Sequence, residues 1–212
     1  MNWVHYWQTY FDEHANALDA LVDNGFVLID QALPEQLYAD LVRESRDINR
    51  YQAAKVSAGG RVETVRSDST HWIDEQDEIG RDYLAVLTSL GDVLNQALYL
   101  GVRSVEAHYA QYDVGQFYAR HRDNPKDSNI RAISTVLYLN SANLNSALDD
   151  LQAPEVWQAE WGGELRLEDL HHVVQDILPI ANRLVVFQSD LPHEVLPATQ
   201  IRRSIAGWLR RD

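Results

Sequence analysis

The chain has 212 residues, 45% of them hydrophobic and 24% charged, so it is long enough to bury a sizeable core. Its formal net charge of −14 is unsuited to a nucleic-acid partner, because phosphate binding needs clustered Lys and Arg. The acidity suits a basic or neutral partner, or it serves only solubility. The absence of cysteine excludes disulfides, iron–sulfur clusters and Cys nucleophiles.

The first 23 residues lack an apolar core flanked by basic residues, which a secretory signal would require. No stretch approaches the roughly 20 consecutive apolar residues that a membrane helix needs. We therefore expect a cytoplasmic protein with no membrane partner. The length predicts a single domain over residues 1–212.

Apolar side chains at helical spacing predict a first helix over residues 2–22. The side chains that carry this pattern are Trp3, Tyr6, Trp7, Tyr10, Phe11, Leu18, Leu21 and Val22. Asn24-Gly25 is expected to end this helix, since glycine adopts the left-handed conformation found after helix ends. Phe26–Ile29 then predicts a short strand.

Pro34 stands where a second helix is expected to begin. Residues 53–69 are predicted to be irregular, with Gly59-Gly60 and mixed charges. Apolar periodicity between Ile79 and Leu98 predicts a long amphipathic helix, which Gly101 is expected to cap.

Short β-type runs follow one another after residue 100. They are Val105–Tyr112, Phe117–His121, Ala132–Leu139, Gly163–Leu167, Val173–Leu178, Arg183–Phe187, Glu194–Leu196 and Ser204–Leu209. A mainly helical part over residues 1–100 and a strand-rich part over 101–212 predict an α+β fold, with a barrel or sandwich that carries helices on one side. Ser141–Trp161 is predicted to be a loop or lid.

His121 and Asp123 stand at positions i and i+2, which point to the same face of an extended strand. Both can therefore reach one metal ion from a single strand end. His193 is the best candidate for a third ligand. Two His and one carboxylate leave open positions on the metal, as oxygen activation by Fe(II) requires.

A short His-x-Asp pattern is weak evidence for a metal site by itself, because a strand-end His near a surface Asp has the same sequence pattern. Two His and one Asp could also hold zinc in a hydrolase, but no general base is placed by a motif. We interpret the remaining histidines as structural or surface residues: His5, His14, His71, His108, His171 and His172.

The surrounding sequence strengthens the metal hypothesis. The segment Tyr118–Pro125 resembles the iron-binding segment of prolyl hydroxylases in the 2-oxoglutarate/Fe(II) dioxygenase superfamily, of the oxygen-sensing type and its bacterial relatives. Five further segments resemble that family in the same order: Val65–Asp74, Val136–Asn140, Gly162–Leu167, Arg183–Val195 and Arg202–Trp208.

The resemblance implies a double-stranded β-helix, which is a jelly-roll barrel buttressed by N-terminal helices. It also implies residue roles. His121, Asp123 and His193 would bind iron, Arg202 would bind the distal carboxylate of 2-oxoglutarate, Tyr138 would assist it, Tyr112 would line the pocket, and Ser204 would support Arg202. A guanidinium suits a buried carboxylate because it forms two parallel hydrogen bonds. Arg203 neighbours Arg202 on the strand and should point the other way.

The implied cofactors are Fe(II), 2-oxoglutarate and O2, with ascorbate as reductant. The implied reaction hydroxylates a prolyl residue in a protein or peptide while 2-oxoglutarate is converted to succinate and CO2. A translation-machinery protein such as elongation factor Tu is one candidate substrate. The region 53–74 would be a substrate loop in which Arg66 and Asp68 clasp the peptide, unless it is only a solvated polar loop.

Two features depart from the family. Ser141–Trp161 is longer than usual, and the helix over residues 2–22 matches no family element. Three alternatives stay open: the same chemistry on a non-prolyl substrate, a cupin-like metalloenzyme that does not use 2-oxoglutarate, and a binding module without activity. The Arg202-x-Ser204 pattern argues against the cupin-like enzyme, since that enzyme needs no carboxylate anchor there.

Overall fold

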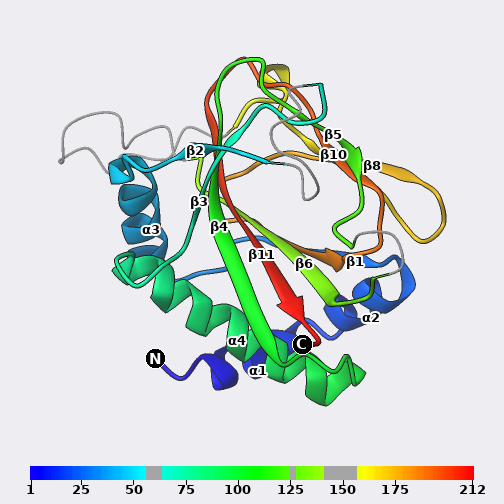
Figure 1. The fold of residues 1–212 in the computed structure, drawn as a ribbon. Helices are drawn as coiled ribbons and strands as arrows, with labels where there is room; N and C mark the ends of the chain where they lie inside the picture. The colour runs from blue at the N-terminus through cyan, green and yellow to red at the C-terminus, as the bar shows by residue number, and fades with distance from the viewer. Residues whose placement is uncertain (56–63, 125–127, 141–156) are drawn as a thin grey trace.

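The computed structural model describes residues 1–55, 64–124, 128–140 and 157–212. Within them, helices lie along one side of an assembly of antiparallel strands (Figure 1). The helices are α1 (Trp3–Glu13), α2 (Asn16–Asp23), α3 (Glu35–Asp47), α4 (Glu78–Leu98) and a 3₁₀ turn at Ala159–Trp161. The strands are β1 (Phe26–Ile29), β2 (Gln52–Ala53), β3 (Ser69–Trp72), β4 (Ser104–Tyr112), β5 (Tyr118–His121), β6 (Arg131–Tyr138), β7 (Leu165–Glu168), β8 (Val174–Ile177), β9 (Leu184–Gln188), β10 (His193–Val195) and β11 (Arg202–Arg210).

The strands form two antiparallel sheets. The larger has the order β1-β9-β6-β11-β4-β3-β2, and the smaller has the order β5-β10-β7-β8. Side chains of both sheets pack into one shared core, so the sheets face each other. The predicted α+β jelly roll is confirmed, but the sheets do not close into a barrel. The eight predicted strands after residue 100 are all present, with ends that shift by no more than about two residues.

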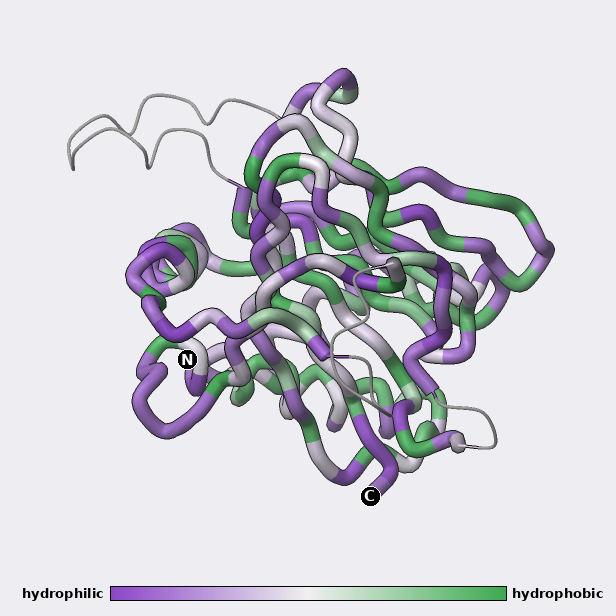
Figure 2. Tube along the Cα trace, turned by 45° about the horizontal axis from the view of Figure 1, so that its top comes forward, coloured by the Kyte–Doolittle hydropathy of each residue, from purple (hydrophilic) through white to green (hydrophobic). Residues whose placement is uncertain are grey.

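Alternation along the strands of the larger sheet divides the interior into two cores. Figure 2 shows hydrophobic and hydrophilic residues following one another along the chain. On β4, Ala107 and Tyr109 face the helices, whereas Ala110 and Tyr112 face the smaller sheet. The same two-residue period runs along β6, β9 and β11, because successive side chains of a strand point to opposite faces. The core between the sheets is where polar residues of the strands gather.

Helix α4 covers the outer face of the larger sheet. Gly207 on β11 permits this close approach, since a Cβ there would lie 2.7 Å from Leu87 of α4. The helix ends at Tyr99, which has a φ of 55°, so Gly101 does not cap it as predicted. The left-handed position falls two residues earlier, where Asn95 also accepts a hydrogen bond from the Tyr99 N–H.

The predicted single helix over residues 2–22 is two helices. Residue His14 leaves the helical region at φ −123° and ψ 59°, and its ring stacks on Tyr10. The break lets α1 pack on α4 through the buried Trp7, while α2 packs on β1 and β9. One straight helix could not meet both surfaces. No helix in the described residues combines the length and apolar character that crossing a membrane requires.

Candidate active site

Two histidines meet where the strands of the smaller sheet pair. His121 ends β5 and His193 begins β10, and the two are direct partners across the antiparallel pair. Asp123 follows β5 by two residues, so its side chain returns to the same side. One carboxylate oxygen lies 3.6 Å from Nε2 of His121, and the other lies 3.6 Å from Nε2 of His193. One ligand atom from each residue fits within 4.8 Å of the others, a spacing suited to one metal ion.

Each imidazole is fixed with Nε2 free for a metal. The Nδ1 of His121 donates to the Ala119 carbonyl at 2.8 Å, and that of His193 donates to the Leu191 carbonyl at 2.9 Å. A carbonyl only accepts hydrogen bonds, so the proton must lie on Nδ1 and the lone pair on Nε2. This arrangement, with the outer nitrogen held by the backbone, is typical of metal-binding histidines.

Asp123 is held by hydroxyl groups behind it. Ser134 on β6 donates to Oδ2 at 2.6 Å, and Ser189 lies 2.9 Å from the Ser134 hydroxyl. Burial raises the pKa of the Asp123 carboxyl, but His193, His121 and the Ser134 hydrogen bond outweigh this effect and hold the pKa below its ordinary value. The carboxylate is therefore ionised and oriented before any ligand binds.

His193 lies deeper than His121 and packs edge-on against Phe187 at 4.9 Å. Burial lowers its pKa to about 4, and Asp123 opposes this shift only in part. The imidazole is accordingly neutral at neutral pH, which is the form that binds a metal.

A cavity of about 300 Å³ extends from these three residues toward Arg202 on β11. The Arg202 side chain is 1% exposed, and no carboxylate in the described residues forms an ion pair with it. Its guanidinium donates to the Gly163 carbonyl at 3.0 Å and to the Ser204 hydroxyl at 3.3 Å. A buried cation without a charged partner is costly, so this end of the cavity suits an anion.

Two tyrosines flank that cation. The Arg202 guanidinium carbon lies 5.0 Å from the ring centres of both Tyr112 and Tyr138. The buried Tyr138 hydroxyl has no hydrogen-bond partner in the described residues. Burial raises the pKa of both phenols, so each keeps its proton and can donate. Arg203, as predicted, points to the opposite face, where it contacts Gln111.

The region predicted to be a substrate loop is anchored in the site. Arg66 pairs with Asp68 at 2.7 Å, and Asp68 is fully buried, so these two side chains are not solvated. Arg66 also bridges to β5 through the backbone of Tyr118 and lies 4.2 Å over the Tyr118 ring. Residues 56–63 of this region lie outside the described part of the chain.

Several wall residues of the cavity were not predicted. They are Lys55, Trp72, His108, Arg131 and Trp208. Strand alternation is the signal that could have found two of them. His108 lies four residues before Tyr112 on β4, and Trp208 lies six residues after Arg202 on β11, so each shares a face with its predicted neighbour.

The sequence from residue 107 to residue 210 matches the family model of the 2OG-Fe(II) oxygenase superfamily. A prolyl-4-hydroxylase from Pseudomonas putida is similar over 93% of this chain and 98% of its own, with 38% identity and a TM-score of 0.78. The chain belongs to the 2OG-Fe(II) oxygenase superfamily.

This oxygenase is also similar to a prolyl hydroxylase from Trichoplax adhaerens that was solved with a peptide fragment of the hypoxia inducible factor oxygen degradation domain. That match has 26% identity and a TM-score of 0.81, and it covers 97% of this chain and 93% of that one. A search of curated protein sequences finds no significant match. The superfamily uses Fe(II), 2-oxoglutarate and O2, which fits the three-residue group and the uncompensated Arg202.

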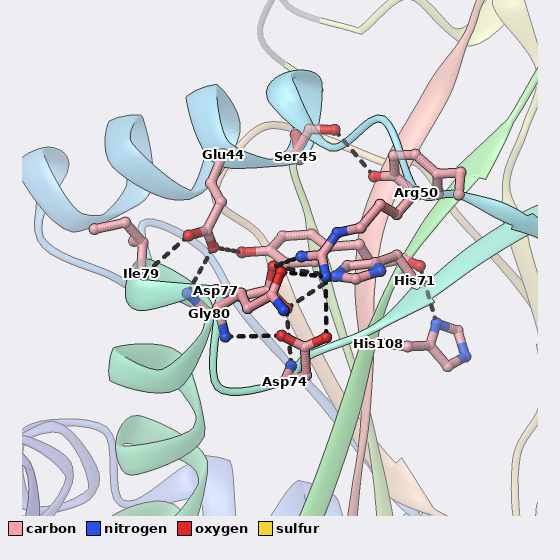
Figure 3. Close-up of polar contacts among 12 residues, drawn as sticks. Glu44, Ser45, Arg50, His71, Asp74, Asp77, Ile79, Gly80 and His108 are labelled. Atoms are coloured by element: carbon pink, nitrogen blue, oxygen red, sulfur yellow. Dashed lines mark hydrogen bonds and ion pairs between the residues drawn. The ribbon is translucent and has the colours of Figure 1, made fainter.

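The oxygenase has a second group of potential metal ligands, formed by His71, Asp74 and Asp77 (Figure 3). Its two carboxylates already have hydrogen-bond and ion-pair partners within the protein. Asp77 accepts from His71 at 2.8 Å and from Arg50 at 3.1 Å, and Arg50 also reaches Asp74. The Arg50 guanidinium thus occupies the position that a metal ion would need.

Next to this group, Glu44 accepts hydrogen bonds from the backbone N–H groups of Ile79 and Gly80, and from the Tyr109 hydroxyl at 2.5 Å (Figure 3). A carboxylate at the first turn of α4 is favoured by the unpaired N–H groups and the dipole there. These contacts join α3, β4 and α4, so we interpret the whole cluster as structural.

Two predictions fall outside the described residues. The long loop or lid at Ser141–Trp161 is described only from residue 157, where Trp157 donates to the Gly162 carbonyl and the 3₁₀ turn begins two residues later. Pro125, the last residue of the segment that resembles the iron-binding motif, also lies outside them.

Proposed function

We propose that this oxygenase hydroxylates a prolyl residue in a peptide or protein, using Fe(II) held by His121, Asp123 and His193. One observation carries the proposal: a single cavity contains both the three free ligand atoms and the uncompensated cation Arg202. Two His and one carboxylate with open positions is the ligand set of non-haem Fe(II) oxygenases.

The chain's residues would prepare the metal site before the reaction. The Ala119 and Leu191 carbonyls fix the tautomers of His121 and His193, and Ser134 fixes Asp123. When bound, Fe(II), 2-oxoglutarate and O2 would supply the oxidising chemistry: 2-oxoglutarate would lose CO2 and take one oxygen atom of O2 to become succinate, and the other oxygen atom would enter the substrate. The protein itself needs no acid–base pair at the target carbon.

Arg202 would hold the distal carboxylate of 2-oxoglutarate. Its guanidinium is fixed by the Gly163 carbonyl, and Ser204 lies beside it on the same strand face. The Tyr138 hydroxyl, which lacks a partner in the described residues, would donate to the same carboxylate, and Tyr112 would close the wall of the pocket. Two charge-assisted bonds and one phenol bond suit a dicarboxylate.

The prolyl substrate is supported by the similarity to the Pseudomonas putida prolyl-4-hydroxylase at 38% identity and to the Trichoplax adhaerens enzyme with its peptide. The wall near the metal includes two indoles, Trp72 and Trp208, which offer apolar surface to a pyrrolidine ring. We infer that Arg66 and Asp68, paired beside β5, form the inner border of the peptide path.

A degenerate peptide library with a fixed proline tests the substrate class. Wild-type protein with Fe(II), 2-oxoglutarate, ascorbate and air should yield hydroxyproline, detected by mass spectrometry after hydrolysis. Basic proteins, which suit the net charge of −14, and translation-machinery proteins such as elongation factor Tu form the second tier of the screen. Succinate formation with hydroxylation at another residue type would establish the chemistry and refute the prolyl assignment.

A further inference from the structure

His108 places an unused nitrogen in the cavity wall. The residue lies on β4, is 5% exposed and lines the cavity that holds the candidate metal ligands. Its Nδ1 donates to the Tyr109 carbonyl at 3.2 Å, as the dashed line at His108 in Figure 3 shows. Because Nδ1 carries the proton, Nε2 is an acceptor, and no described residue donates to it. His108 is also not part of the three-ligand group.

The strand register places His108 between the two functional ends of the cavity. Across the sheet it pairs with Trp72 of β3 on one side and with Ala206 of β11 on the other. Two residues before Ala206 on β11 is Ser204, which accepts a hydrogen bond from Arg202. Two residues after Ala206 is Trp208, whose cross-strand partner Ser134 donates to Asp123. His108 therefore lies in the cavity wall between the Arg202 end and the end at Asp123.

The ring is held rigidly. Trp72 meets it edge-on at 5.0 Å, and Trp208 packs against it at 5.3 Å. The cross-strand neighbour Ala206 is small, and it lines the same cavity as His108. Burial lowers the pKa of His108 to about 4, so the acceptor form is the one present at neutral pH.

The two arginines that act electrostatically on His108 are already engaged, and the buried Trp208 indole N–H has no partner among the described residues, so it does not donate to His108. Arg131 contacts Glu106 and the Asp123 carbonyl, and Arg66 contacts Asp68. Above the pKa values of its carboxyl groups, 2-oxoglutarate has oxygen acceptors and no donor, so it cannot satisfy an acceptor nitrogen. Water can donate to this nitrogen in the free protein, so a substrate that displaces the water has to supply the donor in its place.

Resting on the proposed function, we propose that His108 Nε2 accepts a hydrogen bond from the backbone N–H of a residue flanking the target proline, and so helps to determine specificity. The proline itself cannot supply the bond, because its nitrogen carries no hydrogen. A single acceptor in an aromatic wall discriminates well, since a substrate without the donor leaves that acceptor buried and unpaired.

The test replaces one N–H at a time. The best proline peptide from the library is resynthesised with an ester oxygen in place of each flanking amide N–H, and kcat/KM for hydroxylation is measured. One ester position should lower kcat/KM about tenfold in wild-type protein. His108→Leu should lose about tenfold on the amide peptide and show no penalty for that ester. His108→Gln, which retains an acceptor oxygen, should keep part of the penalty.

Two results would overturn the inference: no ester position affects wild-type protein, or the penalty is the same in wild type and H108L. If H108L does not fold, His108→Phe replaces it, because this variant keeps a ring in the aromatic wall and removes the acceptor. These results differ from a failure of the proposed function, in which wild-type protein hydroxylates proline in no library peptide.

Discussion

The ring of Tyr118 lies nearly parallel to that of His121, with centroids 3.6 Å apart and an angle of 17° between the planes. The guanidinium carbon of Arg66 lies 4.2 Å from the same Tyr118 ring centre. Since both groups lie this near the centre, they occupy opposite faces of the ring. Arg66, which is paired with Asp68, thus packs on one face of the Tyr118 ring, and the candidate iron ligand His121 packs on the other.

Removing that ring should loosen the metal site. Tyr118→Leu should raise the dissociation constant for Mn(II), used in place of Fe(II), by about three- to tenfold, which corresponds to one aromatic contact. Tyr118→Phe is the matched control, because it keeps the ring and removes only the hydroxyl. Electron paramagnetic resonance of free Mn(II) gives both constants. Equal affinity in Y118L and wild type would mean that the stack does not position His121.

Ser134→Ala should weaken metal binding more than Y118L does, because Asp123 loses the hydroxyl that donates to Oδ2 at 2.6 Å. Groups that orient a metal ligand typically change affinity by about tenfold or more. Ser189→Ala provides the comparison: its hydroxyl contacts Ser134 and leaves the Ser134–Asp123 bond in place, so its effect should be smaller. Calorimetric titration with Mn(II) would show the order. A larger loss in S189A than in S134A would contradict this view of the site.

Arg202→Met should raise the KM for 2-oxoglutarate by about ten- to a hundredfold, because a charge-assisted pair in a buried site is lost. Arg203→Met is the control, since its side chain lies on the other face of β11 and contacts Gln111. Succinate formation at increasing 2-oxoglutarate gives both values. An unchanged KM in R202M would show that Arg202 does not hold the distal carboxylate of 2-oxoglutarate.

Acid should destabilise the metal-free protein between about pH 6.5 and pH 4. Burial lowers the pKa of His108 and of His193 to about 4, whereas an unfolded histidine titrates near 6.5. In that window the unfolded chain binds more protons, so the free energy of unfolding falls as the pH falls, by at most about 3 kcal/mol for each histidine. Urea unfolding after chelator treatment measures this slope.

The variant His108→Leu separates the two contributions. It lacks one of the two titrating groups, so its unfolding free energy should depend less steeply on pH in the same window than that of the wild type. Identical slopes would show that His108 is not held neutral by burial.

Strand alternation and the His-x-Asp spacing were sufficient to predict much of the molecule. The pattern from Ser104 to Arg210 predicted the strands because apolar faces on both sides of the larger sheet require a two-residue period. The same period placed His121 beside Asp123. The sequence indicates His193 as the best candidate for the third ligand, but the strand pairing that brings it beside His121 is a long-range feature that the residue pattern does not contain.

Features set by tertiary packing were not predictable. The residue types around His14 do not indicate a helix break, because the break follows from the different surfaces on which α1 and α2 pack. Tyr99 adopts the left-handed conformation although a glycine follows two residues later. The role of His108 in the cavity wall depends on its cross-strand neighbours Trp72 and Ala206, and these are known only once the strands are in register.

The most direct test of the central claim is 2-oxoglutarate turnover without any peptide. Wild-type protein is compared with His121→Ala and with His5→Ala, an exposed histidine on α1, in the presence of Fe(II), ascorbate and air. We predict slow succinate formation by wild type and H5A, and none by H121A. Equal succinate from H121A and wild type would contradict the assignment of the metal site. No succinate from any of the three, together with no 2-oxoglutarate chelate absorption band in the anaerobic iron complex, would contradict a 2-oxoglutarate oxygenase altogether.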